Sequence, residues 1–273
     1  VRLIIIIFRS VSLKGSMEGI KFIFAPKKGF SLASVNAALG QVFYSLSLCM
    51  GITITYGSYL SKKENIPKSC AVVAGMDTLL AILAGIAIFP AVFVFGLEPG
   101  QGPGLVFVTL PKVFGAMSGG SIFAIAFFIL MFFAALTSAI ALLEVVVSFA
   151  IDSWGWSRNK SVAVMGIAVA ILGIPSALSS GLLADVTILN YSVFDFIGMI
   201  SDNILLPIGG ILMCYFIGWK FDITKLTDEM EQGCPNFKIK KLWIASIKYV
   251  APILLIIVTV SGFVGVYHSI TGM

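Results

Sequence analysis

Charged residues are scarce in this 273-residue chain: 11% of the residues are charged, whereas 59% are hydrophobic. Soluble domains carry about 25% charged residues, so this composition excludes a mainly soluble protein and predicts a polytopic membrane protein. About 20 apolar residues span a bilayer, and the chain is long enough for six spans. Its net charge of +5 comes from short basic clusters between apolar runs, which is typical of topology signals and not of nucleic-acid binding.

Residues for metal binding and catalysis are also few. The chain has one histidine and four cysteines, and the cysteines show neither metal-ligand spacing nor a disulfide framework. It lacks an HExxH sequence, a phosphate-binding loop and a histidine–serine–acid set. These absences argue against an enzyme, and the clustered basic residues described above do not predict nucleic acid as a partner. The expected partners are the lipid bilayer and a small solute.

The sequence also lacks an initiator methionine and a signal peptide, and it opens on the apolar run VRLIIII. This run is too short for a full span. We therefore expect a fragment that begins inside a membrane helix, so that residues 1–273 form a single membrane transport domain truncated at its N-terminus.

The apolar runs predict six membrane spans, separated by turns rich in lysine, glycine or proline. The predicted spans cover residues 33–60, 70–95, 121–151, 162–178, 191–218 and 243–267. Residues 96–120 contain several glycines and prolines, which predicts a re-entrant or surface-packed outer hairpin. The basic turns at 61–69, 152–160 and 219–242 favour the cytoplasm, although the basic segment 9–32 argues the other way.

The first predicted span carries no charge from Ala37 to Tyr59, but small or polar residues interrupt its middle at every second position. These residues are Ser45, Ser47, Cys49 and Gly51. A helix that only faces lipid does not need this pattern. A helix unwound near the membrane midplane does, because unwinding frees backbone carbonyls and hydroxyls that can hold an ion or a polar solute. We predict that Ser45–Gly51 is the unwound centre of a transporter helix.

Two further places combine oxygen ligands with membrane depth. Asp77 lies inside an apolar span, where an acid usually marks an ion path; the alternative is a hydrogen-bonded structural acid. Thr137 and Ser138 are adjacent hydroxyls in a long apolar run, and their alternative role is bonding back to a carbonyl of their own helix. Hard cations such as sodium prefer hydroxyl, carbonyl and carboxylate oxygens. The three places together therefore favour alkali-ion sites over transition-metal sites.

Four segments, in order along the chain, resemble the neurotransmitter:sodium symporter family, and its bacterial amino-acid branch most closely. They are residues 38–60 (ALGQVFYSLSLCMGITITYGSYL), 102–114 (GPGLVFVTLPKVF), 131–144 (MFFAALTSAIALLE) and 203–219 (NILLPIGGILMCYFIGW). The resemblance implies an all-α polytopic membrane protein with a partial leucine-transporter fold, from the end of the fifth helix through the eleventh, with a broken sixth helix. It also implies sodium-coupled symport of a neutral or hydrophobic amino acid across the plasma (inner) membrane by alternating access.

The same resemblance implies the residues of the sites, with two sodium ions expected. The first sodium site is matched by Ser45 and Asp77, and the second by Ala134 (through its carbonyl), Thr137 and Ser138. The substrate pocket of this half is matched by Tyr44, Ser45, Ser47, Met50, Ser138 and Leu142. Because the carboxylate of Asp77 would supply the negative charge that chloride supplies in the animal transporters, the resemblance implies that chloride is not required.

The outer gate departs from the family pattern. Gln41 and Tyr44 match gate residues, although Tyr44 stands where phenylalanine is usual. The acid that many members carry in the tenth helix falls on Gly198. Asp195 and Asp202 lie three residues before and four residues after it, so that all three share one helical face. Either acid could serve the gate, or either could have a structural role.

A rival to transport is a membrane subunit or receptor that keeps the fold without moving a solute. The oxygen ligands matched at both ion sites argue against it. The substrate itself is open: Tyr44 and Met50 fit a medium or bulky hydrophobic side chain, while Cys49 stands where glycine is usual and would make the pocket slightly smaller.

Overall fold

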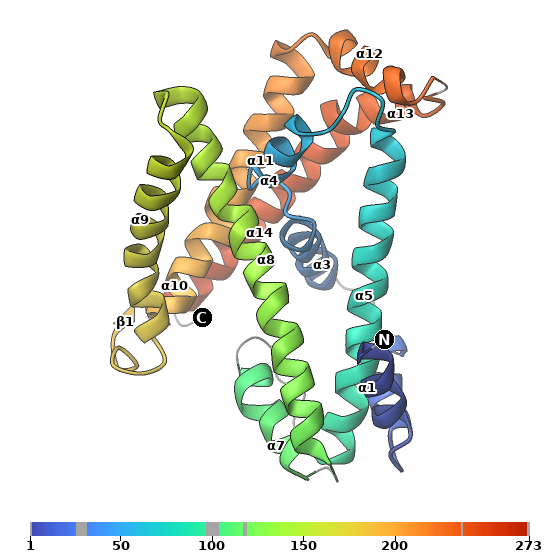
Figure 1. Ribbon diagram of the computed structural model, residues 1–273, viewed down its shortest axis with the longest axis vertical. Helices are drawn as coiled ribbons and strands as arrows, with labels where there is room; N and C mark the ends of the chain where they lie inside the picture. Colours follow the sequence, from blue (N-terminus) through green and yellow to red (C-terminus); the bar gives the residue numbers. More distant parts are fainter. Residues whose placement is uncertain (1, 26–31, 97–103, 117–118, 236, 272–273) are drawn as a thin grey trace. The chain divides into compact units, whose positions relative to one another are not determined.

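The structure, a computed structural model, describes residues 2–25, 32–96, 104–116, 119–235 and 237–271 (Figure 1). Within these residues the chain is helical apart from its turns and one two-stranded hairpin. Contacts divide the chain into two compact units. One comprises Val1–Phe30 and Val72–Ser138, and the other comprises Ser31–Ala71 and Ala139–Met273.

Five helices of the described residues are long and apolar enough to cross a membrane. They are Ile66–Val94, Gly120–Trp154, Arg158–Leu178, Val193–Lys220 and Lys240–Val264. Many of their large apolar side chains are exposed, as Ile122 and Leu172 are, which suits helices whose surroundings are hydrocarbon and whose backbone groups are paired internally. The chain is therefore a multi-pass membrane protein, while the predicted limits of each span remain predictions.

The first unit is built from short helices around two long ones. Its elements are α1 (Arg2–Val11), α2 (Met17–Phe24), α5 (Ile66–Val94) from Val72 on, η1 (Leu105–Thr109), α7 (Leu110–Ala116) and α8 (Gly120–Trp154) up to Ser138. Its core lies where α7 packs on the end of α5, with Val92 and Val113 almost fully buried. Helix α2 crosses α5 at Gly19, where an added Cβ would lie 2.5 Å from the backbone nitrogen of Pro90, so this crossing requires glycine.

The predicted outer hairpin at 96–120 falls partly outside the described residues, which omit 97–103 and 117–118. Its described part is helical over η1 and α7. The basic segment 9–32 contains the short helix α2, while residues 26–31 lie outside the described part of the chain. The hairpin therefore remains a prediction.

The second unit contains the remaining elements. They are α3 (Leu32–Ser45), α4 (Ile52–Ser58), the rest of α8, α9 (Arg158–Leu178), β1 (Thr187–Ile188), β2 (Tyr191–Ser192), α10 (Val193–Ile200), η2 (Ser201–Leu205), α11 (Leu206–Tyr215), η3 (Phe216–Lys220), α12 (Ile223–Gly233), α13 (Lys240–Ala245), η4 (Ser246–Val250) and α14 (Ala251–Thr271). The run from α10 to η3 forms one long helix with two π-helical segments, η2 and η3, and α13 to α14 forms another with η4. These two long helices pack together along α11 and α14, and α14 also contacts α3.

The hairpin before α10 sets the start of that helix. Thr187 pairs with Ser192 and Ile188 with Tyr191 in an antiparallel register. The two turn residues, Leu189 and Asn190, have φ values of 53° and 66°. Two consecutive positive φ values fit the twist of a two-residue hairpin, so the chain reverses tightly and enters α10 directly.

The helix predicted to be broken is broken in the structure. Helix α3 ends at Ser45 and α4 begins at Ile52. Between them Ser47, Cys49 and Gly51 have φ values of 53°, 66° and 80°, a left-handed conformation that is unusual for residues other than glycine. Three of the four small or polar residues at every second position thus take left-handed conformations, and the predicted unwound centre is confirmed.

Candidate functional site

Residues 46–51, here named the unwound segment, lie against two other helices of the second unit. A Cβ added to Gly51 would lie 2.8 Å from Cγ1 of Val145 on α8. The thiol of Cys49 fills a notch at Gly210 of α11, where an added Cβ would lie 2.6 Å from Sγ. Both contacts require glycine, because any side chain at Gly51 or Gly210 would occupy the space of its neighbour. The second half of the segment is therefore held by packing at two points.

The first part of the unwound segment is turned by backbone hydrogen bonds. The N–H of Leu46 donates to the carbonyl of Val42 at 3.1 Å, and the N–H of Leu48 donates to that of Phe43 at 2.9 Å. Helix α4 then begins after Gly51. This geometry places the C-terminal end of α3, the negative end of its dipole, at Ser45, where it favours a cation.

Two hollows lie beside the broken helix, both within the second unit. One of about 730 Å³ lies among α3, α10, η2 and α14, and one of about 350 Å³ lies among α3, η2, α11 and α14. Tyr44, Asp202 and Asn203 line both, and Gln41 lines the smaller one. The structure therefore brings the two gate residues predicted on α3, Gln41 and Tyr44, to the same hollow as Asp202.

The other predicted gate acid, Asp195, is engaged at the start of α10. The hydroxyl of Ser192 accepts a hydrogen bond from the N–H of Asp195 at 3.1 Å and donates one to its carboxylate at 2.7 Å. This arrangement caps the helix and places a negative charge at the positive end of its dipole. Asp195 also lines the larger hollow, but its carboxylate already has a structural role.

The remaining predicted ion ligands, apart from Ser45, lie in the first unit. Asp77 is half-buried on α5. On α8 the hydroxyl of Thr137 donates to the carbonyl of Ala134 at 2.8 Å, so two predicted ligands of the second sodium are neighbouring oxygens on one turn. The same bond fits the alternative role of a hydroxyl bonded back to its own helix. The ligand sets remain predictions, as do the roles of Ser47, Met50, Ser138 and Leu142.

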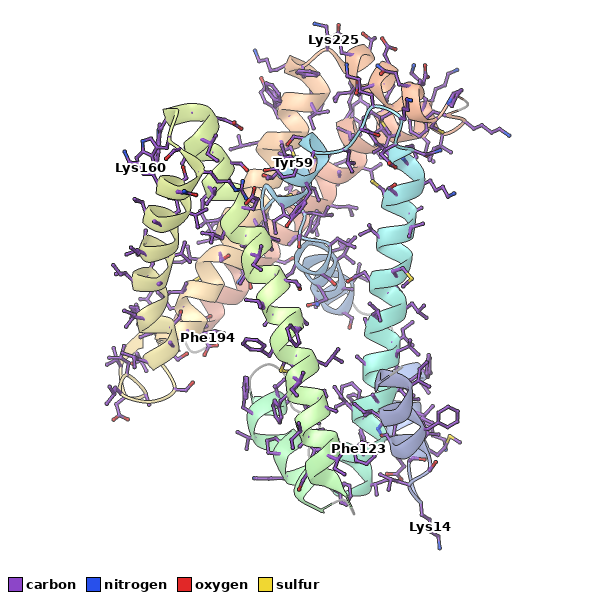
Figure 2. The ribbon with its side chains drawn as sticks, viewed as in Figure 1. Lys14, Tyr59, Phe123, Lys160, Phe194 and Lys225 are labelled. Carbon is purple, nitrogen blue, oxygen red and sulfur yellow. The ribbon has the colours of Figure 1, made fainter. Side chains whose placement is uncertain are left out.

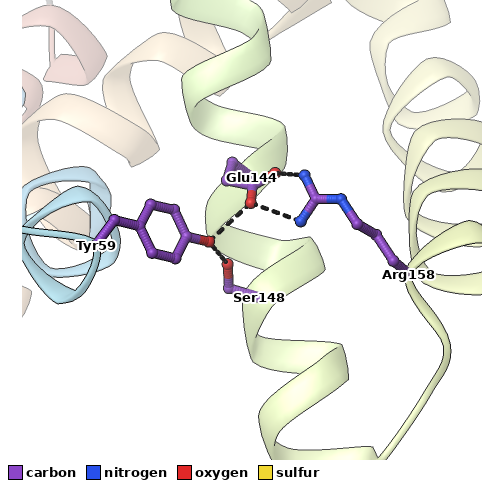
Figure 3. A network of polar contacts seen from close by, with 4 residues as sticks. All are labelled: Tyr59, Glu144, Ser148 and Arg158. Carbon is purple, nitrogen blue, oxygen red and sulfur yellow. Dashed lines mark hydrogen bonds and ion pairs between the residues drawn. The ribbon is translucent and has the colours of Figure 1, made fainter.

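A polar network that the sequence analysis did not predict joins α4, α8 and α9 (Figure 3). Arg158 donates to both carboxylate oxygens of Glu144, at 3.0 and 2.9 Å. The hydroxyl of Tyr59 donates to the same carboxylate at 2.8 Å and lies 2.9 Å from the hydroxyl of Ser148. The side chain of Glu144 is 14% exposed and that of Arg158 is 62% exposed. The charge of a carboxylate as buried as that of Glu144 needs hydrogen-bond partners. Its bidentate ion pair with Arg158 is among the strongest polar contacts available.

One signal in the sequence could have pointed to this network, namely Glu144, an acid inside an apolar span. Such an acid requires a partner. The sequence does not say which partner, because two cations, Arg158 and Lys160, follow at the start of the next helix. The structure separates them, because the ammonium of Lys160 (labelled in Figure 2) lies over the ring of Trp156 at 4.5 Å. Only the fold shows that Arg158 turns to Glu144 and that Tyr59 completes the set.

Comparisons with known proteins find a family of sodium symporters and single sodium-dependent transporters. The sodium:neurotransmitter symporter family matches residues 1–271. The uncharacterized sodium-dependent transporter YhdH of Bacillus subtilis (strain 168) is 38% identical over 257 residues, which cover 93% of this chain and 57% of that protein. An uncharacterized sodium-dependent transporter of Haemophilus influenzae (strain ATCC 51907 / DSM 11121 / KW20 / Rd) is 37% identical over 266 residues, which cover 95% of this chain and 57% of that protein.

A solved structure is similar over the same region. The crystal structure of MhsT in complex with L-phenylalanine matches with a TM-score of 0.85 and 43% identity, over 96% of this chain and 60% of that chain. The chain thus spans less than two thirds of the length of the relatives it matches.

The notch at Gly210 makes a testable prediction. Gly210→Ala would place a methyl group 2.6 Å from Sγ of Cys49 and 3.0 Å from both terminal carbons of Leu255. We expect this overpacking to lower the free energy of unfolding by about 1–3 kcal/mol. The measurement is the thermal unfolding midpoint of the purified full-length protein. Cys49→Gly in the same protein should recover part of the loss, since it removes the closest atom.

Gly209→Ala is the matched control for the notch. Its added Cβ would meet only the carbonyl oxygen of Cys49, at an ordinary 3.6 Å, and it gains the same helix propensity as alanine at Gly210. Equal midpoints for the two alanine variants, or no recovery on adding Cys49→Gly, would show that the thiol does not occupy the notch.

The network makes a second prediction. Arg158→Gln leaves the sheltered carboxylate of Glu144 without its charged partner, and we expect the thermal unfolding midpoint to fall by the equivalent of about 1–3 kcal/mol. In a Glu144→Gln background, Arg158→Gln should lower the unfolding midpoint by less, because no unpaired carboxylate remains. Lys160→Gln, two residues along the same helix, is the control and should have little effect. Additive losses in the double variant would contradict a direct pairing.

Proposed function

Because the chain belongs to the sodium:neurotransmitter symporter family, we propose that the full-length protein couples uptake of a hydrophobic amino acid to sodium entry across the plasma membrane. Family membership confirms that the chain is related to transporters and not to enzymes. The likeness to MhsT confirms the predicted all-α, partial leucine-transporter fold.

The observation that carries the proposal is the interruption of the helix between Ser45 and Ile52. Secondary transporters hold ions and substrate at such interruptions, where unwound backbone and helix ends offer dipoles inside the membrane. Here the interruption has three left-handed residues and is held by close packing against α8 and α11. A helix that served only to span the bilayer would gain nothing from this strain.

For the ions, we propose Ser45 and Asp77 at a first sodium site. For the second we propose Ala134, Thr137 and Ser138. The hydrogen bond from Thr137 to the carbonyl of Ala134 supports this assignment, because it commits the hydroxyl proton and leaves the lone pairs of the hydroxyl oxygen for a cation. A carboxylate at Asp77 supplies a fixed negative charge, so chloride is not required.

For the substrate, we propose a hydrophobic amino acid held by Tyr44, Ser45, Ser47, Met50, Ser138 and Leu142. MhsT was crystallised with L-phenylalanine, and its 43% identity to this chain supports a similar class of substrate. The thiol of Cys49 has its own space at Gly210 of α11, which favours a pocket that still admits a bulky side chain.

For the outer gate, we propose Gln41, Tyr44 and Asp202, with Asp195 confined to capping α10. Asp202 and Tyr44 line both hollows beside the broken helix, whereas Asp195 is bound to Ser192. The π-helical segment η2 carries Asp202, and such segments are frequent at functional sites.

The function is tested by uptake into vesicles that contain the full-length protein, with a pool of labelled amino acids. We expect accumulation that requires an inward sodium gradient, is lost when potassium replaces sodium, and is unchanged without chloride. At −100 mV one sodium supplies about 2.3 kcal/mol, or about fiftyfold accumulation, and two supply over a thousandfold. No uptake by folded protein under any gradient would instead favour a non-transporting subunit or receptor.

Asp77→Asn is the variant for the ion assignment within the same experiment. Removing the carboxylate should weaken sodium-coupled uptake or make it depend on chloride, because an anion must then supply the lost charge. Uptake equal to that of the parent at every sodium and chloride concentration would remove Asp77 from the site.

The two acids near the gate give a separate prediction. Asp202→Asn should slow transport about tenfold, the equivalent of about 1.4 kcal/mol, because the closing gate loses its charge. Asp195→Asn should leave the transport rate near that of the parent and lower the unfolding midpoint by the equivalent of about 0.5–1 kcal/mol, because it weakens the start of α10. The reverse pattern would transfer the gate role to Asp195.

A further inference from the structure

The two long helices of the second unit cross closely at their π-helical segments. Segments η3 and η4 are in contact, and a Cβ added to Gly218 would lie 3.3 Å from Cγ and 3.7 Å from Cα of Lys248. Gly218 is buried, so the stem of Lys248 lies across the backbone of η3. This crossing fixes the position of a half-buried lysine about two turns inside the membrane-length helix Lys240–Val264.

Three aromatic rings surround this crossing and remain open to the surroundings. Trp219 stacks on Tyr215 with ring centroids 6.0 Å apart, and it meets Tyr249 edge-on at 6.2 Å. The three side chains are between 50% and 61% exposed. Tryptophan and tyrosine gather at the membrane–water interface because their rings are apolar and their polar atoms remain wet. The composition and exposure of the cluster therefore suit headgroup depth.

The two lysines at the crossing form no ion pair with a described carboxylate. Lys220 follows Trp219, and neither Lys220 nor Lys248 lies within 4.0 Å of a described carboxylate, whereas Lys240 is paired with Glu231 at 2.9 Å. The sequence has no acid from 203 to 221 or from 233 to 273. The next acid, Asp222, accepts hydrogen bonds from the N–H and hydroxyl of Thr224 at the start of α12, and these bonds lower the pKa of its carboxyl.

We propose that Trp219, Tyr249, Lys220 and Lys248 form a binding site for the phosphate headgroup of an anionic phospholipid. The lipid belongs to the leaflet that α12 and α13 face, where lysine side chains such as Lys225 extend from the helices (Figure 2). The two ammonium groups bind the phosphate oxygens, the rings contact the glycerol and upper acyl region, and the apolar stem of Lys248 lies along the protein. Anionic lipids attract basic segments by roughly 1 kcal/mol per lysine near the surface.

The site is distinct from the transport site, and it does not depend on the proposed function. None of its residues lines either hollow beside the broken helix. Its test therefore needs neither sodium nor substrate, and it can succeed or fail whatever the uptake experiments give.

The test measures quenching of tryptophan fluorescence by brominated lipid in the full-length protein. The protein is reconstituted in phosphatidylcholine with a fixed small fraction of either dibrominated phosphatidylglycerol or dibrominated phosphatidylcholine. The Trp219→Phe variant gives the signal of all other tryptophans, so the difference isolates Trp219. We expect phosphatidylglycerol to associate at Trp219 more strongly than phosphatidylcholine, by about fivefold for each lysine at low salt.

Variants at the two lysines separate this site from general membrane anchoring. Lys220→Gln and Lys248→Gln should each lower the preference, the double variant should abolish it, and Lys248→Arg should keep it. Lys160→Gln is the matched control, because Lys160 also lies beside a tryptophan, 4.5 Å from the ring of Trp156, but on α9. Unchanged unfolding midpoints in the glutamine variants show that the fold is intact.

Three outcomes would overturn the proposal. Equal quenching by the two lipids would make the cluster an ordinary interfacial anchor. A preference that survives the double glutamine variant, or one that Lys160→Gln removes, would place the lipid elsewhere. Displacement of the brominated lipid from Trp219 by inorganic phosphate would make the site one for small anions and not for lipid.

Discussion

An interruption inside a membrane helix leaves backbone groups without helical partners, and in hydrocarbon each such group is costly. Much of the second unit follows from this constraint. The unwound segment keeps backbone hydrogen bonds at Leu46 and Leu48. Close packing holds the rest of it in place, because Gly51 admits Val145 of α8 and Gly210 admits the thiol of Cys49. Helices α11 and α14 pack together around the buried Leu255. After the thiol of Cys49, the methyl groups of Leu255 are the atoms nearest to the notch at Gly210.

The second half of the broken helix is fixed by charge as well as by packing. Tyr59 at the end of α4 meets the carboxylate of Glu144, which Arg158 neutralises from α9. An apolar surrounding makes such a network strong when it is complete and costly when it is not. This network thus joins three separate helices, α4, α8 and α9, by side-chain hydrogen bonds.

Local pattern was sufficient to predict several features. The scarcity of charge and the long apolar runs predicted a multi-pass helical protein, and the small or polar residues at every second position from Ser45 to Gly51 predicted the break. These features could be predicted because helix length and backbone strain depend on neighbouring residues. The two acids near Gly198 could not be told apart in this way, since they share a helical face. Their difference lies in Ser192, the residue directly before α10, whose hydroxyl binds the carboxylate of Asp195.

The sequence by itself therefore determined the class of the protein, the presence of a broken helix and the family to which its motifs point. The tertiary structure decided which distant residues meet: Cys49 with Gly210, Glu144 with Arg158 and not with Lys160, and Lys248 with Gly218. The physical reason is the same in each case. Such contacts depend on where two helices cross and on which of their side chains is small enough or charged enough to fill the crossing, and neither property is recorded in the spacing of residues along one helix.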